Sequence, residues 1–324
     1  MISITRRAGL LALALAAATA TALAGLSPAG AQQAPLKEFR IGFQKAGLPV
    51  VTRHQQIIEK ALAPEGIAVR WVEFPSGPPL LEALNAGAVD VGWTGDAPPI
   101  FAQAAGANLV YVAALPSNGA GEAILVPADS AVTSVAELKG KKVGVTKGSS
   151  AHNLLVAALE RAGVPFADIT PVYLSPADAA AAFASGKIDA WSIWDPFFAI
   201  AELRHKPRVL TTTKDELNVN TYFLANKSFA GAHPAVVIKA EDALKQSAKW
   251  ADAHRSEVAK VLAEVTGVDL AAQTRAAERQ VFGVGPLTPA VIAGQQQTAD
   301  RFTKLGLIPR AIVVKDAVWV RPQS

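Results

Sequence analysis

The sequence predicts an α/β protein built from two similar lobes. Apolar runs of strand length alternate with amphipathic helical patterns along most of the chain, which is typical of parallel sheets covered by helices. The same order of elements occurs twice, about 100 residues apart, which indicates an internal repeat. The chain has 324 residues, 51% of them hydrophobic, and is therefore long enough to form two hydrophobic cores.

The first 31 residues have the features of a secretion signal. Arg6 and Arg7 form a positive start, an apolar Ala-rich stretch covers 8–26, and the A-x-A triplet at 29–31 matches a cleavage site. A membrane anchor is the alternative, but the weak hydrophobicity and the small-residue end favour cleavage. The arginine pair also resembles a twin-arginine signal. We therefore expect an exported mature protein.

The composition excludes several kinds of site. There is no cysteine, so a disulfide framework, a thiolate metal site and a cysteine nucleophile are excluded. The five histidines stand far apart in the sequence, which argues against a multi-histidine metal site. The formal net charge of +4 is spread along the chain and falls by two when the leader is removed, which argues against nucleic-acid binding. We expect no metal and no cofactor.

Three matched pairs of segments, all in register, form the internal repeat. They are 40–45 with 142–147, 87–90 with 186–189, and 95–98 with 194–196. Ligands of open parallel sheets lie beyond the carboxyl ends of the strands. Two facing lobes would therefore place Asp96, Asp195 and the loops after the strands around a shared cleft.

Two apolar runs mark where the chain is expected to pass between the lobes. They lie at 123–126 and 222–225, each after a Gly-rich or polar stretch. We therefore assign 37–123 and 224–324 to lobe 1, and 124–223 to lobe 2.

The region from about 235 to 308 is predicted to be helical, because its apolar residues have helical spacing. Thr288 and Pro289 are expected to be the N-cap and first residue of the last helix. We expect these helices to pack on lobe 1.

A strand-like run that ends in a Gly-Ser-Ser turn is the strongest sign of a binding site. The run at 143–147 meets Gly148, Ser149 and Ser150, and an amphipathic helix follows. Ser149 or Ser150 would cap that helix, and the free amides at its start would face the cleft. Such a helix start favours an anion. The alternative is a capped helix without a ligand, and the spacing does not match a nucleotide P-loop.

Two strand ends supply further candidate residues. The turn at Thr94 and Gly95 would offer a hydroxyl and amides to the same anion. Asp96 is expected to cap or orient instead, because a carboxylate repels an anion, and Asp195 before a proline also suits capping. The sequence shows no assembly of nucleophile, base and oxyanion donors, so we do not expect an enzyme.

Aromatic and basic side chains near these turns have two interpretations each. Trp194 is expected to form a wall over the ligand, whereas the alternative places both Trp191 and Trp194 in the core. His152 would support the site indirectly or lie on the helix surface. Lys147 would add positive potential or point into solvent.

Several of these segments together resemble the aliphatic sulfonate-binding proteins of bacterial ABC importers. The likeness spans nearly the whole mature chain, in strings at 72–77 (VEFPSG), 94–106 (TGDAPPIFAQAAG), 147–155 (KGSSAHNLL), 190–196 (AWSIWDP) and 295–300 (QQQTAD). The resemblance implies a type II periplasmic-binding-protein-like fold. In it, each lobe is a parallel-rich sheet with helices on both faces, and the ligand lies in the interlobe cleft.

The resemblance also implies a function. A protein of this kind captures an aliphatic sulfonate in the periplasm and delivers it to the permease subunits of an ABC transporter, for sulfur acquisition; we expect a monomer. The implied ligand contacts are Gln44, Thr94, Gly95, Gly148, Ser149, Ser150 and Trp194, to which we add Tyr222 for the organic tail. Asp96, His152 and Asp195 are expected to support these contacts or to cap helices.

A sulfonate stays ionised at physiological pH and has three acceptor oxygens, so the expected site is a set of uncharged N–H and O–H donors. One alternative is another small oxyanion ligand, such as taurine, nitrate or a sulfate ester. A second is an enzyme on the same fold with His152 and Asp195 as acid and base. A third is a sensor or surface interaction protein.

Overall fold

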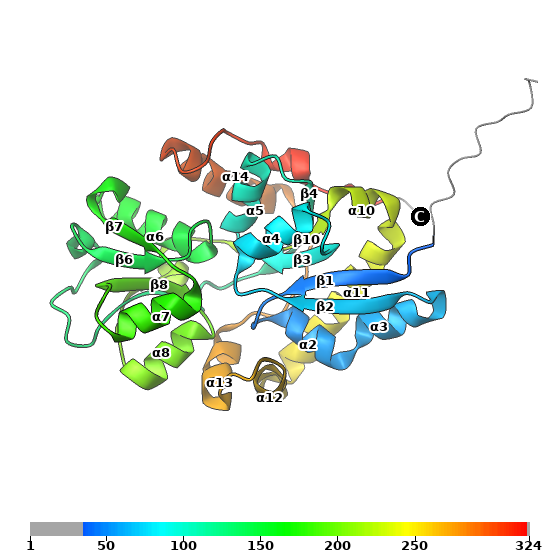
Figure 1. The fold of residues 1–324 in the computed structure, drawn as a ribbon, viewed down its shortest axis with the longest axis horizontal. Helices are drawn as coiled ribbons and strands as arrows, with labels where there is room; N and C mark the ends of the chain where they lie inside the picture. The colour runs from blue at the N-terminus through cyan, green and yellow to red at the C-terminus, as the bar shows by residue number, and fades with distance from the viewer. Residues whose placement is uncertain (1–34, 323–324) are drawn as a thin grey trace, which may run out of the picture. The chain divides into compact units, whose positions relative to one another are not determined.

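The computed structural model describes residues 35–322, so the predicted secretion signal lies outside the described residues. From Glu38 onward the chain forms one compact unit. This unit contains two sheets of five strands each, and helices cover them (Figure 1).

The first sheet has the strand order β2-β1-β3-β10-β4. Its strands are β1 (Glu38–Phe43), β2 (Ala68–Glu73), β3 (Val91–Thr94), β4 (Leu109–Pro116) and β10 (Asn220–Asn226). The first three strands in the chain pair in parallel, whereas β10 is antiparallel to both β3 and β4.

The second sheet repeats this arrangement with the order β7-β6-β8-β5-β9. Its strands are β5 (Glu122–Val126), β6 (Lys142–Val145), β7 (Thr170–Tyr173), β8 (Ala190–Trp194) and β9 (Arg208–Thr212). Here β5 is the antiparallel strand, between β8 and β9. The two sheets correspond strand for strand, so the predicted two-lobed α/β architecture is confirmed.

The chain passes between the sheets earlier than we expected. It leaves the first sheet after Pro116 and enters the second at Glu122, and it returns between Thr212 and Asn220. The expected boundaries after residues 123 and 223 therefore fall inside strands β5 and β10. The apolar runs that suggested the passages are instead buried strands in the interior of each sheet, and the passages are the polar segments before them.

The repeated Gly-hydrophobe-Asp segment has the same local role in both sheets. The Asp90 carboxylate accepts a hydrogen bond from the Arg40 amide in β1, at 2.7 Å, and the Asp189 carboxylate accepts one from the Lys142 amide in β6, also at 2.7 Å. Each carboxylate thus connects the residues just before one strand to the neighbouring strand of the same sheet. Asp90 is also paired with the Arg40 guanidinium.

Helices cover both faces of each sheet. Around the first sheet lie α2 (Leu48–Gln55), α3 (Ile57–Leu62), α4 (Gly77–Asn85) and α5 (Ala97–Ala104), and around the second lie α6 (Ser150–Arg161), α7 (Pro176–Ala184), α8 (Phe197–His205) and α9 (Thr213–Glu216). Strand β5 shows why both faces are covered. Ala123 and Leu125 face a cluster formed with α7 and α8, and Ile124 and Val126 face another formed with α6, because side chains alternate along a strand.

The predicted helical region after residue 235 is confirmed as four helices, preceded by the short α10 (Lys227–Ala232). The four are α11 (Pro234–Ala253), α12 (Arg255–Thr266), α13 (Leu270–Arg279) and α14 (Pro289–Lys304). Thr288 caps α14 as expected, because its side chain accepts from the Val291 amide. α11 and α12 pack on α2 and α14 packs on α5, whereas α13 packs on α8 of the second lobe.

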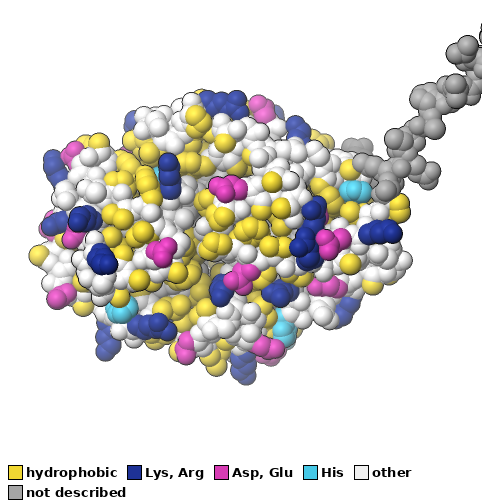
Figure 2. All heavy atoms as spheres, in the orientation of Figure 1, with side chains coloured by type: hydrophobic (Ala, Val, Ile, Leu, Met, Phe, Trp, Pro, Cys, Tyr) yellow, Lys and Arg dark blue, Asp and Glu magenta, His cyan; other side chains and the backbone are white. Residues whose placement is uncertain are grey.

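The two lobes touch directly on one side, through α5, α6 and α14 (Figure 1). The Asn153 side chain donates to the Asp96 carboxylate, and the Arg301 guanidinium pairs with Glu160. No helix within 35–322 has the length and apolar character that a membrane crossing requires. On the face in Figure 2, charged side chains of both signs are interspersed, and apolar surface lies near the middle.

Candidate functional site

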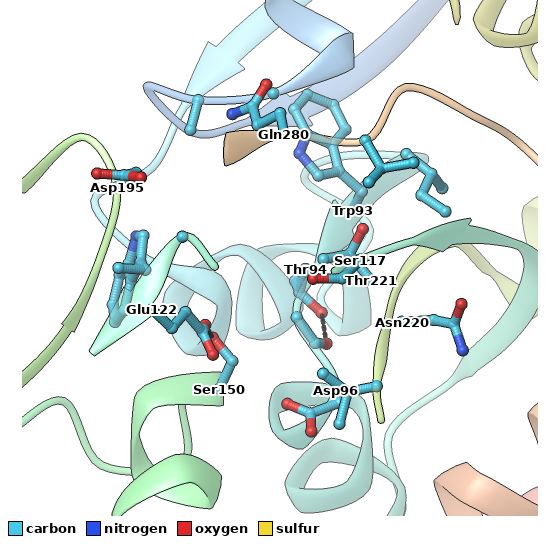
Figure 3. A pocket seen from close by; sticks show the side chains of 18 of the residues that line it. Trp93, Thr94, Asp96, Ser117, Glu122, Ser150, Asp195, Asn220, Thr221 and Gln280 are labelled. Carbon is cyan, nitrogen blue, oxygen red and sulfur yellow. Dashed lines mark hydrogen bonds between the residues drawn. The ribbon is translucent and has the colours of Figure 1, made fainter. Parts of the chain in front are cut away.

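A cavity of about 200 Å³ lies between the two sheets and takes its walls from both lobes (Figure 3). Its lining includes the ends of β3 and β8, the passage from β4 to β5, the start of α6 and the segment after α13. Of the candidate residues, the lining contains Gln44, Thr94, Gly95, Asp96, Ser149, Ser150, Trp194 and Asp195. The structure therefore brings together residues that lie up to about 150 positions apart, as expected for strand ends that face a shared cleft.

Asp96 lies at the end of β3 and caps α5. Its carboxylate accepts from the Ala97 amide at 2.8 Å and from the Asn153 side chain of the other lobe. Asp96 is only 2% exposed, and this burial, together with the nearby Glu122 carboxylate, raises its pKa to about 7. The expected capping role of Asp96 is thus what the structure shows.

The start of α6 differs from the expected row of free amides. Ser149 is the N-cap residue, and its own amide donates to the Thr146 carbonyl at 3.2 Å. The Gly148 amide donates to Nδ1 of His152, also at 3.2 Å, and Gly148 does not line the cavity. Within the described residues, only the Ser150 amide of these three lacks an acceptor.

The hydroxyl groups expected to donate to a ligand donate to the protein instead. Thr94 donates to the Gly95 carbonyl at 3.0 Å, Ser149 to the Thr146 carbonyl at 2.7 Å, and Ser150 to the Glu122 carboxylate. A hydroxyl has one hydrogen, so these groups have only acceptor capacity left. In this structure the three hydroxyls are therefore engaged with protein acceptors, and their contact with a ligand stays a prediction.

Tyr222 lies in the core rather than in the cavity. It is 2% exposed, and its ring meets the Tyr111 ring edge-on, with the ring centres 5.1 Å apart. Its predicted contact with an organic tail is not supported by this position. The residues just before it in β10, Asn220 and Thr221, line the cavity instead.

His152 is also outside the cavity. The imidazole is fully buried within an aromatic cage formed by Phe101, Phe166, Tyr173 and Phe302. Burial and the charge of Lys147 lower its pKa to about 4. His152 accepts from Gly148 and thereby supports the turn, which fits the expected supporting role rather than a helix-surface position.

A family model described as NMT1/THI5 like matches residues 62–258, which is more than half of the chain. The chain belongs to the NMT1/THI5-like family. This NMT1/THI5-like protein is similar to a protein of Escherichia coli strain K12 named as an aliphatic sulfonates-binding protein. The two are 41% identical over 304 residues, which cover 92% of this chain and 95% of the relative.

Solved structures of related proteins have the same fold. The alkanesulfonate-binding protein SsuA from Xanthomonas axonopodis pv. citri, bound to MOPS, matches with a TM-score of 0.83 and 42% identity, over 88% of this chain and 99% of that one. The periplasmic aliphatic sulphonate binding protein SsuA from Escherichia coli matches with a TM-score of 0.80 and 40% identity, over 89% of this chain and 94% of that one.

An ion-pair network at the cavity edge of this NMT1/THI5-like protein has no motif in the sequence. Arg279, the last residue of α13, pairs with Asp195 at 3.3 Å and with Glu202, and its guanidinium lies 4.0 Å from the centre of the Phe198 ring. Asp195 also accepts from the Ala199 amide at 3.0 Å, in the first turn of α8, whose N-cap residue is Pro196. Burial raises its pKa to about 6 despite the attraction of Arg279.

Other lining residues of this NMT1/THI5-like protein carry no motif in the sequence. They include Trp93, Ser117, Glu122, Asn220, Thr221 and Gln280. Only Glu122 has a feature in the sequence that could have marked it as a site residue, because it is a charged residue directly before the apolar run 123–126. The described residues contain no group of three or more His, Cys, Asp or Glu side chains that would hold a metal ion.

Proposed function

We propose that this NMT1/THI5-like protein captures an aliphatic sulfonate in the cavity between its lobes and delivers it to the permease of an ABC importer. The observation that carries the proposal is the position of the cavity, which both lobes line beyond the carboxyl ends of β3 and β8. The ligand class is supported by relatives at 40–42% identity that are named for sulfonate binding. One of them holds MOPS, a propanesulfonate with a morpholine ring.

The donors left for the anion are N–H groups rather than hydroxyls. The Ser150 amide, at the positive end of α6, and the indole N–H groups of Trp93 and Trp194 donate to no described residue. Gln44 uses one of its two amide hydrogens on the Trp93 carbonyl. Hydrogen bonds to a charged group contribute roughly 1.5–3 kcal/mol each. Three or four of them are enough for a micromolar dissociation constant after the cost of immobilising the ligand.

The same positions support a binding role over catalysis. The pair that an enzyme would need, His152 and Asp195, is not assembled, since only Asp195 lines the cavity. A relative described as periplasmic supports a periplasmic location. The protein would act there as a monomer, and its partner would be the permease subunits in the inner membrane.

Alkanesulfonates are expected to protect the protein against thermal unfolding. A ligand at 100 times its dissociation constant stabilises the folded state by about 2.7 kcal/mol. For a chain of this size, that corresponds to a rise in Tm of about 4–5 °C. Scanning calorimetry with alkanesulfonates, sulfate and nitrate measures this rise. No shift with any sulfonate at millimolar concentration would contradict the proposal, and product formation detected by mass spectrometry would favour an enzyme.

Substitution of Gly95 by alanine is expected to weaken sulfonate binding at least tenfold. A Cβ on Gly95 would lie 2.6 Å from Cβ of Ser150, across the two lobes, so the lobes would have to separate. Isothermal titration calorimetry measures the affinity. Gly231→Ala is the control, because a Cβ there has no heavy atom within 4 Å. Equal affinity of Gly95→Ala and Gly231→Ala would show that this approach of the lobes is not needed for binding.

A further inference from the structure

A second direct contact between the lobes lies at the cavity edge, where α13 packs on α8 (Figure 1). Helix α13 belongs with the first lobe, because it packs on α12, which in turn packs on α2. The segment directly after α13, residues 280–283, lines the cavity. The end of α13 is therefore the place where the carboxy-terminal helices meet both the second lobe and the cavity.

The side chain of Arg279, the last residue of α13, reaches from the first lobe to the second. Its guanidinium pairs with Asp195 at 3.3 Å and with Glu202, and it lies over the Phe198 ring at 4.0 Å from the ring centre. All three partners lie directly after β8 or within α8. An arginine suits this position, because a planar guanidinium can donate to two carboxylates and still lie over an aromatic face.

The backbone that carries Arg279 is fixed to the first lobe by a second arginine. Arg255, the first residue of α12, donates to the Gln280 carbonyl at 2.8 Å and to the Ala277 carbonyl at 3.3 Å. The same guanidinium lies 5.2 Å from the centre of the Phe282 ring. Because the backbone on both sides of Arg279 is held in this way, an ion pair made by Arg279 restrains the first lobe as a whole.

Burial distinguishes this ion pair from those at the other contact between the lobes. There, Arg301 and Lys304 of α14 pair with Glu160 of α6, whose side chain is 47% exposed. Such exposed pairs contribute little, because water solvates both charges. The side chains of Arg279 and Asp195 are only 18% and 6% exposed, so their separation would leave a nearly buried carboxylate without its counter-charge. Separation of the lobes is therefore opposed more strongly at Arg279 than at Glu160.

We infer that Arg279 is a positioning residue that bridges the two lobes and thereby slows the release of the ligand from the cavity. It acts through Asp195 and Glu202, which it holds against the end of α13, and not by contact with the sulfonate. The inference rests on the proposed function, and it assigns the residence time of the ligand to one ion-pair network. Separation of the lobes breaks these ion pairs, so their strength adds to the barrier to release.

The rate of sulfonate release tests the inference. MOPS is the ligand, in Tris buffer at pH 7.5, where Asp195 is ionised because its pKa is about 6. Stopped-flow mixing follows the fluorescence of the tryptophans that line the cavity. We expect Arg279→Gln to release MOPS about tenfold faster than the wild type, with little change in the association rate. Arg279→Lys keeps the charge but not the planar fork, and is expected to give an intermediate rate.

Arg275→Gln is the matched control on the same helix. Arg275 pairs with Glu202 at 3.6 Å, but its side chain is 48% exposed and does not line the cavity. We expect this variant to release MOPS at the wild-type rate, because an exposed ion pair contributes little. Release as fast as from Arg279→Gln would show that any loss of charge from α13 has the same effect, and would overturn the assignment to Arg279.

A double variant tests whether Arg279 acts through its partner. Asp195→Asn removes the charge but keeps a side-chain oxygen that can accept from the Ala199 amide. Both substitutions remove the same ion pair. We therefore expect Asp195→Asn/Arg279→Gln to accelerate release by less than the product of the two single effects. Effects that multiply would show that the two residues act independently, and would overturn the inference.

Small-angle X-ray scattering of the ligand-free proteins provides a readout that does not depend on sulfonate binding. We expect a larger radius of gyration for Arg279→Gln than for the wild type or Arg275→Gln, because its lobes separate more readily. An unchanged release rate for Arg279→Gln overturns the inference while the proposed function stands. If the wild type binds neither MOPS nor any other sulfonate, the proposed function fails. In that case a larger radius for Arg279→Gln supports the bridge between the lobes, and an equal radius overturns it.

Discussion

Replacement of Asp90 by alanine is expected to destabilise the protein by about 3 kcal/mol. The Asp90 carboxylate is 2% exposed and accepts three hydrogen bonds from Arg40, one from the amide at 2.7 Å and two from the guanidinium at 3.1 and 2.5 Å. Its loss leaves the Arg40 charge without its partner. The figure is at the low end for a buried ion pair, because the Arg40 side chain is 29% exposed and water compensates in part. Urea unfolding measures the change.

The internal repeat provides the control for this substitution. Asp189 occupies the equivalent position in the second lobe and accepts the Lys142 amide, but it is exposed and has no such guanidinium partner in the described structure. We expect Asp189→Ala to cost about 1 kcal/mol or less. Equal losses for Asp90→Ala and Asp189→Ala would show that the Arg40 ion pair contributes little.

Acidification from pH 7 to pH 4 is expected to remove about 3 kcal/mol of stability through His152 alone. The ordinary pKa of histidine is 6.5, and the pKa of His152 in the fold is about 4. Between these values the unfolded chain binds a proton that the folded protein does not bind. Stability from His152 is therefore complete above about pH 6.5 and is lost as the pH falls towards 4.

The contribution of His152 is measured as the difference in unfolding free energy between the wild type and His152→Gln. Asp96 and Asp195 have raised pKa values, about 7 and about 6, and give the opposite slope, because the folded protein holds their protons to higher pH. We expect His152→Gln to have a lower free energy of unfolding than the wild type at pH 7. The difference between the two proteins is expected to narrow on acidification. A control variant, His205→Gln, removes an exposed histidine of α8. A gap that stays constant with pH for His152→Gln would contradict the assignment.

The architecture was predictable because the sequence contains an internal repeat, in which each half has the same order of elements. Segments of similar sequence form equivalent strands, and the repeated aspartates at positions 90 and 189 make equivalent hydrogen bonds to β1 and β6. The points of passage between the lobes were harder to place. An apolar run such as 123–126 predicts a buried strand, but it does not say to which of two sheets the strand belongs.

The candidate site was predictable only where it lies on local motifs. Strand ends and helix caps placed Thr94, Asp96, Ser149 and Ser150 near the cavity. The direction of each hydroxyl depends on acceptors from distant segments, as Glu122 does for Ser150, and no local pattern reveals such a partner. Arg279 is missed for the same reason, since its place at the cavity follows from the packing of α13 on α8.

The position of β10 has a consequence for the order of folding. Strand β4 is hydrogen-bonded to the rest of its sheet only through β10. In the sequence, β10 follows all the strands of the second lobe. All strands of the second lobe, in contrast, come from one continuous stretch between Glu122 and Thr212. During synthesis, which starts at the amino end, the second lobe can therefore complete its sheet first. The sheet of the first lobe is completed only when β10, about 100 residues after β4, has been synthesised.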